Sequence, residues 1–132
     1  DKLVCSPAFS DKICLVASNG FHIPDKVTMD KLKRIPMVML NEQFSSYRML
    51  VQYLDQQGYP IEKFKIMFQL GSTESVKSTV MAGHGGAFLP YITIKKEVYQ
   101  EQIKIIHVTD FDLNYDVYYD KTFINKMYKW AK

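Results

Sequence analysis

The sequence predicts an α/β fold with a largely parallel sheet and flanking helices. Short apolar runs alternate with helical patterns along most of the chain, which is typical of strands joined by crossover helices. The run at 36–40, PMVML, has the compact apolar character of a strand buried on both faces. Tyr47, Leu50, Val51 and Leu54 recur at helical spacing and form one apolar stripe. Buried strands and one-sided helices together favour a layered α/β domain.

Length and composition are those of a globular domain. The 132 residues are 47% hydrophobic and 23% charged, which suits one domain or two small lobes that share a sheet. No apolar run approaches the roughly 20 residues that cross a bilayer, and no signal-like segment opens the chain. The net charge of +3 comes from dispersed lysines. This pattern predicts a solvated surface rather than a groove for nucleic acid.

The first half of the chain contains two predicted helices among three predicted strands. Thr28 is a suitable N-cap for a short helix that reaches Lys33. Ser45 or Ser46 can cap the amphipathic helix, and Gly58 stands where a left-handed residue ends it. The strands are expected at 2–7, 12–17 and 36–40.

The second half continues the alternation. Ser72 and Thr73 open a helix that ends at Gly83, a shorter helix is expected at 93–98, and Asp120 caps a last helix. Phe64, Ile66, Phe68 and Leu70 alternate with polar or flexible residues, which predicts a strand. The strands are expected at 64–70, 87–89, 103–108 and 115–119.

Residues with the spacing of a catalytic or metal site are absent from the sequence. His22, His84 and His107 are not spaced as metal ligands, and no nucleophile elbow, zinc-protease motif or phosphate loop occurs. No metal and no cofactor is therefore predicted. Cys5 and Cys14 lie in successive strand-like runs, where two free thiols, a redox switch or a disulfide are all compatible with the sequence.

The glycine-rich stretch at 83–86, GHGG, follows a predicted helix and enters a predicted strand. A phosphate-binding loop needs the reverse order, with a strand before the loop and a helix after it. The stretch is therefore predicted to stop the helix and to turn closely into the sheet.

Two strand-to-helix turns are the candidate binding segments. Residues 41–46 follow one strand and residues 71–74 follow another, and both turns are rich in small polar residues. Ligands of open α/β sheets bind outside the carboxyl ends of the strands. Hydroxyls and free N–H groups at a helix start suit a carboxylate or a sulfate. The alternative is that these serines and threonines only cap their helices.

Five collinear segments resemble the effector-binding domain of bacterial LysR-type transcription regulators. They are ICLVAS, VTMDKLKRIPMVML, NEQFSSYRMLVQYLDQQGY, LGSTESVKSTVMAGHGGAFLPYI and NYDVYYDKTFINKMYKW. The fourth is similar to the family's most recognisable stretch, "lgs.e.i…V.aGlGia.lP". Residues 19–24 depart from the family's usual "HPL" order, and His84 is expected to be a surface substitution. Gly86 replaces a branched apolar residue, which predicts extra space behind the cleft.

The resemblance implies a fold like that of type 2 periplasmic binding proteins, with a ligand bound between two α/β lobes. In this scheme the second lobe is complete, at residues 18–108. Residues 1–17 form crossing strands and a remnant of the first lobe, and residues 109–132 form its returning strand and last helix. The N-terminal half of the first lobe and the DNA-binding winged helix-turn-helix are absent from this chain, so DNA contact is expected only through that missing domain.

The resemblance also places the ligand contacts of the second lobe at the two turns and at the strand end near residue 90. A small effector is expected, and two helix N-termini favour an anion, whereas an ionised Glu42 would repel an anion or select an amine. Tyr91 borders the same region. The candidate ligand-binding residues are Glu42, Gln43, Phe44, Ser45, Ser46, Ser72, Thr73 and Pro90.

The function expected from this resemblance is effector sensing in a cytoplasmic, homo-oligomeric regulator, a dimer or a tetramer, which is neither an enzyme nor a membrane protein. Lobe closure would change the geometry of the oligomer on DNA. One alternative is a periplasmic or extracellular solute-binding protein of a transport system, since the same architecture serves both. An α/β enzyme that uses Glu42 or Glu74 is disfavoured, because no base–nucleophile pair accompanies either residue. A purely structural or oligomerising fragment is a third alternative.

Overall fold

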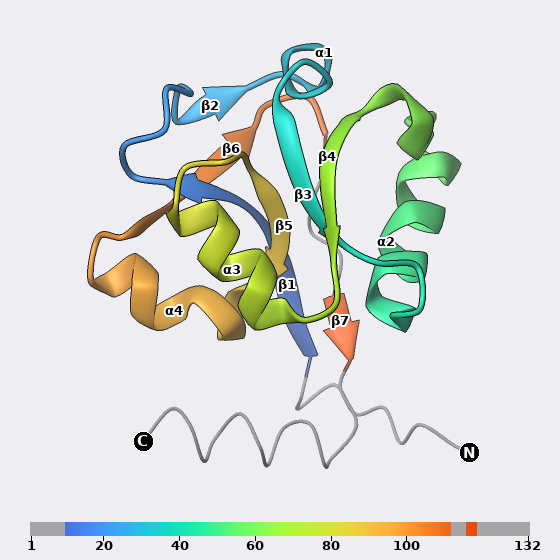
Figure 1. Ribbon diagram of the computed structural model, residues 1–132. Helices are drawn as coiled ribbons and strands as arrows, with labels where there is room; N and C mark the ends of the chain where they lie inside the picture. Colours follow the sequence, from blue (N-terminus) through green and yellow to red (C-terminus); the bar gives the residue numbers. More distant parts are fainter. Residues whose placement is uncertain (1–9, 112–115, 119–132) are drawn as a thin grey trace.

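The computed structural model describes residues 10–111 and 116–118 (Figure 1). The strands are β1 (Ser10–Ser18), β2 (Lys26–Val27), β3 (Pro36–Leu40), β4 (Lys65–Leu70), β5 (Ala87–Pro90), β6 (Ile103–Val108) and β7 (Asp116–Tyr118). The helices are α1 (Met29–Leu32), α2 (Ser45–Gln56), α3 (Thr73–Met81) and α4 (Tyr91–Tyr99), with a 3-10 turn, η2, at Ile61–Lys63. The strand predicted at 2–7 and the helix predicted from Asp120 lie outside the described residues.

Strand β1 is the centre of the sheet. It pairs antiparallel with β5 on one side and with β6 on the other, and its first residues pair with β7. Strands β2 and β6 are parallel, as are β3 and β4, and a parallel bridge between Met37 and Gly86 joins β3 to β5. Among the described strands, β1 alone therefore runs against the rest. The predicted α/β class is confirmed, and the sheet is mixed because β1 lies between two strands of the opposite direction.

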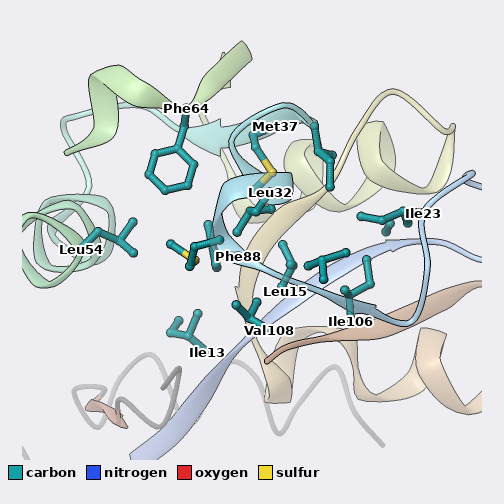
Figure 2. Close-up of a cluster of buried hydrophobic side chains, with 14 of the residues drawn as sticks. Ile13, Leu15, Ile23, Leu32, Met37, Leu54, Phe64, Phe88, Ile106 and Val108 are labelled. Carbon is teal, nitrogen blue, oxygen red and sulfur yellow. The ribbon is translucent and has the colours of Figure 1, made fainter. Parts of the chain in front are cut away.

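Helices cover both faces of the sheet (Figure 1). Helix α2 packs Leu50 and Leu54 into one apolar cluster. This cluster also contains Met29 and Leu32 of α1 and is drawn in Figure 2. Helices α3 and α4 pack Val80 and Ile94 into a second cluster on the other face. Alternate residues of β1 supply the two clusters, with Leu15 in the first and Val16 in the second. We call these groups the α2-side cluster and the α3-side cluster.

Strand β4 contains a bulge. Ile66 lies opposite Met37 of β3, but the next pair joins Phe68 to Val38, so Met67 has no partner across the ladder. An inserted residue reverses the faces of the side chains that follow it. Ile66 accordingly packs against the α2-side cluster, Leu70 packs against the α3-side cluster, and Phe68 is 42% exposed. The predicted strand is confirmed, and the bulge at Met67 divides its apolar side chains between the two faces.

The helix ends follow the local sequence at most positions. Thr28 caps α1 by accepting a hydrogen bond from the Lys31 N–H at 3.2 Å, as predicted. Gly58 after α2 and Gly83 after α3 both have positive φ, which confirms the predicted left-handed ends.

No helix in residues 10–111 and 116–118 is long and apolar enough to cross a membrane.

The GHGG stretch joins α3 to the sheet through a close backbone contact, as predicted. The Gly86 N–H donates to the Pro36 carbonyl at 2.9 Å, and a Cβ on Gly85 would lie 2.5 Å from that same oxygen. His84 is exposed, as expected. The extra space predicted behind Gly86 is absent, because a Cβ there would meet the Val16 carbonyl oxygen at 3.2 Å. The neighbouring backbone fills that volume.

Candidate functional site

The carboxyl ends of β3, β4 and β5 meet at one edge of the sheet. Leu40 and Leu70 lie opposite each other at the ends of β3 and β4, and the Asn41 N–H donates to the Leu70 carbonyl at 2.9 Å. Because Gly86 lies opposite Met37 and both strands run the same way, β5 ends at Pro90 on this edge as well. We call this the carboxyl edge, and it faces the lower part of Figure 1.

The helices that follow these three strands all begin at the carboxyl edge. They start at Ser45 in α2, at Thr73 in α3 and at Tyr91 in α4. The first turn of a helix carries N–H groups without intrahelical partners and a partial positive charge. Three such turns at one edge contribute partial positive charge, which favours an anionic group, whereas the carboxylates of Glu42 and Glu74 at the same edge oppose it.

Ser72 is the N-cap of α3. Its hydroxyl oxygen accepts a hydrogen bond from the Ser75 N–H at 3.0 Å, and its hydroxyl donates to the Ser75 Oγ at 2.8 Å. The capping alternative is therefore correct for Ser72. A ligand contact at this residue would have to use the remaining lone pair of the hydroxyl.

Helix α2 begins without a side-chain cap. Phe44 occupies the N-cap position, and no side chain at that position bonds to the helix N–H groups. The loop before it closes on Asn41, whose side-chain oxygen accepts from the Gln43 N–H at 3.1 Å and whose carbonyl accepts from the Phe44 N–H at 3.2 Å. The helical backbone starts just after this turn, so Ser45 and Ser46 lie in the first turn. The prediction that Ser45 or Ser46 caps α2 is wrong.

Three hydroxyl groups at the carboxyl edge are without partners in the described part of the chain. Ser45, Ser46 and Thr73 make no hydrogen bond through their side chains to any residue in 10–111 or 116–118. Ser46 and Thr73 are half-buried, and Ser45 is exposed. Unpaired hydroxyls in the first turns of two helices provide donors and acceptors for a small polar molecule.

The remaining predicted residues also lie at the carboxyl edge. Glu42 and Gln43 are exposed, Phe44 is half-buried, and Pro90 is the last residue of β5. The Pro90 carbonyl accepts a hydrogen bond from the Thr93 hydroxyl at 2.7 Å. Tyr91, which the sequence also placed here, is 39% exposed. The structure thus brings all eight candidate residues to one edge, and their contact with a ligand stays a prediction.

Arg48 is a residue of this edge that the sequence did not indicate. One terminal guanidinium nitrogen donates to the carbonyl oxygens of Glu42 and Gln43, each at 2.9 Å. Arg48 is the fourth residue of α2, and a charged side chain at an exposed helical position is usually solvated, so no local pattern predicts this contact. The guanidinium fixes the loop that carries three of the candidate residues.

Tyr47 connects α2 to the end of β4. Its phenol hydrogen-bonds the side chain of Gln69, and burial, followed by the nearby charge of Glu42, raises the pKa of Tyr47 above its usual value. The neutral phenol is therefore favoured at the carboxyl edge, where it acts as a structural hydrogen-bonding group.

Lys77 holds α3 against α4. Its ammonium group donates to the Thr93 carbonyl at 3.0 Å and pairs with Glu97 at 3.1 Å and with Glu74 at 3.3 Å. Thr93 lies in the first turn of α4, and Glu74 lies in the first turn of α3. Lys77 thereby fixes the two helix starts relative to each other.

Within the described ranges, no group of three or more His, Cys, Asp or Glu side chains is arranged to hold a metal ion. The edge carries hydroxyls, backbone N–H groups, the Gln43 amide and the Arg48 guanidinium, together with the carboxylates of Glu42 and Glu74. These groups bind polar molecules by hydrogen bonding and charge.

A sheet with flanking helices, whose helix N-termini gather at the carboxyl edge, defines the class of ligand-binding α/β lobes. The LysR substrate binding domain family matches residues 1–119, and the chain belongs to this family. This membership confirms the resemblance drawn from the sequence. The boundaries expected for the lobes, at 1–17, 18–108 and 109–132, stay a prediction.

The chain is similar to proteins that are described as probable transcriptional regulators. The chain is 28% identical over 99 residues to a probable RuBisCO transcriptional regulator of Guillardia theta. The matched region covers 74% of this chain and 32% of the relative. A protein of the same description from Nostoc sp. is 26% identical over 114 residues, covering 85% of this chain and 33% of the relative. The chain thus spans about a third of the length of these relatives.

Solved structures share the fold. The regulatory domain of Synechocystis CcmR in complex with 2-PG superposes with a TM-score of 0.69 at 14% identity, covering 99% of this chain and 68% of that one. The effector-binding domain of QuiR in complex with shikimate gives a TM-score of 0.67 at 9% identity, covering 88% and 53%. The fold expected from the resemblance is therefore confirmed.

Proposed function

We propose that this chain senses a small anionic effector for a LysR-type transcription regulator. The convergence of three helix N-termini at the carboxyl edge is the observation that carries the proposal. In the proposed organisation this edge is one wall of a cleft, and a first lobe supplies the facing wall. Residues 18–108 are the second lobe, and the segments on either side belong to the crossing and to the first lobe.

The unpaired hydroxyls of Ser45, Ser46 and Thr73 supply the hydrogen bonds that fix a ligand's orientation. A carboxylate or phosphate placed between the starts of α2 and α3 would accept from these hydroxyls and from the first-turn N–H groups. Glu42 is exposed on the same loop, so its side chain can remain in water while the anion binds. Glu42, Gln43, Phe44, Ser72 and Pro90 complete the proposed contact set.

The relatives and the shared fold support a regulatory function. The Guillardia theta and Nostoc relatives are described as probable transcriptional regulators, and the two solved domains are complexes with 2-PG and with shikimate. Neither comparison supports the transport-protein alternative or an enzymatic function. In the proposed mechanism, effector binding closes the lobes and shifts a homo-oligomer between two arrangements on DNA, in the cytoplasm. DNA contact belongs to a domain outside this chain.

Titration of the isotope-labelled chain with inorganic phosphate, at constant ionic strength, tests the binding site. Amide NMR signals of Ser45, Ser46 and Thr73 should shift with a common saturation curve, and those near Arg34, at the opposite end of β3, should not. Replacing both Ser46 and Thr73 with Ala should weaken binding about tenfold, whereas Ser78→Ala, on the exposed side of α3, should leave it unchanged. Shifts confined to other surfaces would contradict the proposal.

The complete regulator provides the test of function. The Ser46→Ala, Thr73→Ala double variant should need a higher effector concentration to change transcription of its target promoter, with its maximal DNA affinity retained. An unchanged effector response in the double variant would contradict a ligand-binding function for both residues.

A further inference from the structure

The Arg48 side chain is held against the loop before α2, and the stability of the helix does not explain this conformation. It lies near the start of α2, where the partial positive charge of the helix disfavours a cation. Holding a long, exposed side chain in one conformation also costs rotamer entropy. Both costs are offset by two hydrogen bonds of 2.9 Å to the carbonyls of Glu42 and Gln43. Hydrogen bonds from an ionised donor are stronger than those between neutral groups.

The loop between β3 and α2 is held at three points. The Asn41 N–H is bonded to the Leu70 carbonyl, and the Asn41 side chain closes the turn onto Gln43. Arg48 then binds the two carbonyls that Asn41 leaves unpaired at the apex of the loop. The apex, Glu42 and Gln43, is exposed and packs against no core cluster. The hydrogen bonds from Arg48 therefore fix its position.

We propose that Arg48 is the positioning residue of the carboxyl edge, which it fixes in a binding-competent form before the effector arrives. This inference rests on the proposed function. The guanidinium holds the apex carbonyls on its own side, so the loop enters α2 at a fixed angle. The first-turn groups of Ser45 and Ser46 are thereby presented together. Ordering the loop in the free protein removes an entropic cost from binding.

The same bonds hold a positive charge at the backbone carbonyls of Glu42 and Gln43. An exposed carboxylate on the loop would otherwise repel an anion that approaches the edge. We expect the guanidinium, which is fixed on the backbone carbonyl of that residue, to offset part of this repulsion. Arg48 thus sets both the shape and the charge of the loop.

Replacement of Arg48 by Met and by Lys separates these effects from general stability. Arg48→Met removes both bonds, and Arg48→Lys keeps the charge and a donor. Arg34→Met is the matched control, because Arg34 is an exposed arginine at the opposite end of β3. Backbone order parameters of residues 42–44 are measured in the free chain, and phosphate affinity is measured in ~0.5 M salt, where long-range charge effects are screened.

Order parameters of residues 42–44 should fall from about 0.85 to below about 0.6 in Arg48→Met, while those of α2 beyond its second turn remain unchanged. Phosphate binding should weaken about tenfold, and Arg48→Lys should restore most of both effects. Arg34→Met should change neither. A loop that stays rigid in Arg48→Met would overturn the positioning role, even if affinity falls.

The result that would contradict the proposed function differs from the one that would overturn the positioning role of Arg48. If wild-type chain does not bind phosphate or carboxylates at all, the anion site is wrong, whereas the order parameters still decide whether Arg48 positions the loop. A rigid loop in Arg48→Met together with normal phosphate binding in wild type overturns the positioning proposal alone.

Discussion

Two helix starts of the carboxyl edge use serine differently. The Ser72 hydroxyl oxygen accepts a hydrogen bond from the backbone of α3, whereas the side-chain hydroxyls of Ser45 and Ser46 have no hydrogen-bonding partner in the described residues. The difference arises from the preceding turn. Asn41 closes the loop before α2 and leaves Phe44 at the cap position, so the serines fall inside the helix. The residue type is the same at both helix starts. Whether a serine occupies the N-cap position or the first helical turn decides whether its hydroxyl caps the helix.

Removal of the Ser72 hydroxyl should destabilise the chain. Ser72→Ala leaves the Ser75 N–H without its acceptor, so the free energy of unfolding should fall by about 1 kcal/mol. Ser46→Ala breaks no hydrogen bond in the described structure and should change it by less than about 0.5 kcal/mol. Urea unfolding measures both. Equal effects in the two variants would contradict the assignment of Ser72 as a cap.

Gly85 is a position where only glycine fits. Its φ is +156°, and a Cβ would lie 2.5 Å from the Pro36 carbonyl oxygen, which belongs to the backbone of β3. Backbone atoms in a strand cannot move aside as a flexible side chain can. The residue therefore permits the close approach of β3 to β5.

Gly85→Ala should lower the free energy of unfolding by about 3 kcal/mol, because the new methyl group forces β3 and β5 apart. Gly20→Ala is the control, since nothing lies within 4 Å of a Cβ there, and it should cost less than about 0.5 kcal/mol. Thermal unfolding of the two variants makes the comparison. A small effect at Gly85 would show that the junction is looser than described.

At the scale of elements, α3 and α4 are joined by one ammonium group. The side chains of Lys77 and Glu97 are 13% and 14% exposed, whereas that of Glu74, which pairs with the same lysine, is 59% exposed. Charge pairs that are shielded from water are costly to break from one side, while exposed pairs contribute little. The link to Glu97 should therefore control how the two helices sit together.

Isosteric replacement distinguishes the two partners of Lys77. Glu97→Gln leaves a shielded ammonium without its main counter-charge and should destabilise the chain by about 2 kcal/mol. Glu74→Gln should cost about 0.5 kcal/mol, since water and the screening of an exposed pair replace the lost attraction. Chemical unfolding in parallel gives both values. A larger cost for Glu74→Gln would contradict this ranking.

At the scale of the whole molecule, one sheet supports two apolar clusters. Strands β1 and β3 contribute alternate residues to both faces, with Leu15 and Met37 on the α2 side and Val16 and Val38 on the α3 side. Unfolding one face removes the strands that the other face needs. The two clusters therefore form one cooperative unit.

Leu54→Ala in the α2-side cluster and Ile94→Ala in the α3-side cluster should each lower the free energy of unfolding by about 3 kcal/mol. In both variants, NMR methyl signals from the two clusters should disappear at the same urea concentration. A variant in which one cluster melts before the other would show that the faces fold independently.

The sequence by itself determined the α/β class, the order of the elements and the two turns of the candidate site. These features depend on local signals: apolar periodicity, the Thr28 and Ser72 caps, and the glycines that end α2 and α3. The collinear segments also identified the family that residues 1–119 match. Each signal is contained within a few neighbouring residues, so it can be recognised without the fold.

Tertiary structure alone decided the direction of β1, the bulge at Met67, the contact behind Gly86 and the hydrogen bonds of Arg48 to the loop before α2. Each depends on residues distant in the chain or on backbone geometry that does not follow from residue type. Strand direction is set by pairing with β5 and β6, and the register shift arises only when β4 meets β3. Arg48 reaches its acceptors because the turn at Asn41 places them within its length. The sequence thus located the carboxyl edge, and packing determined which groups at that edge are available to a ligand.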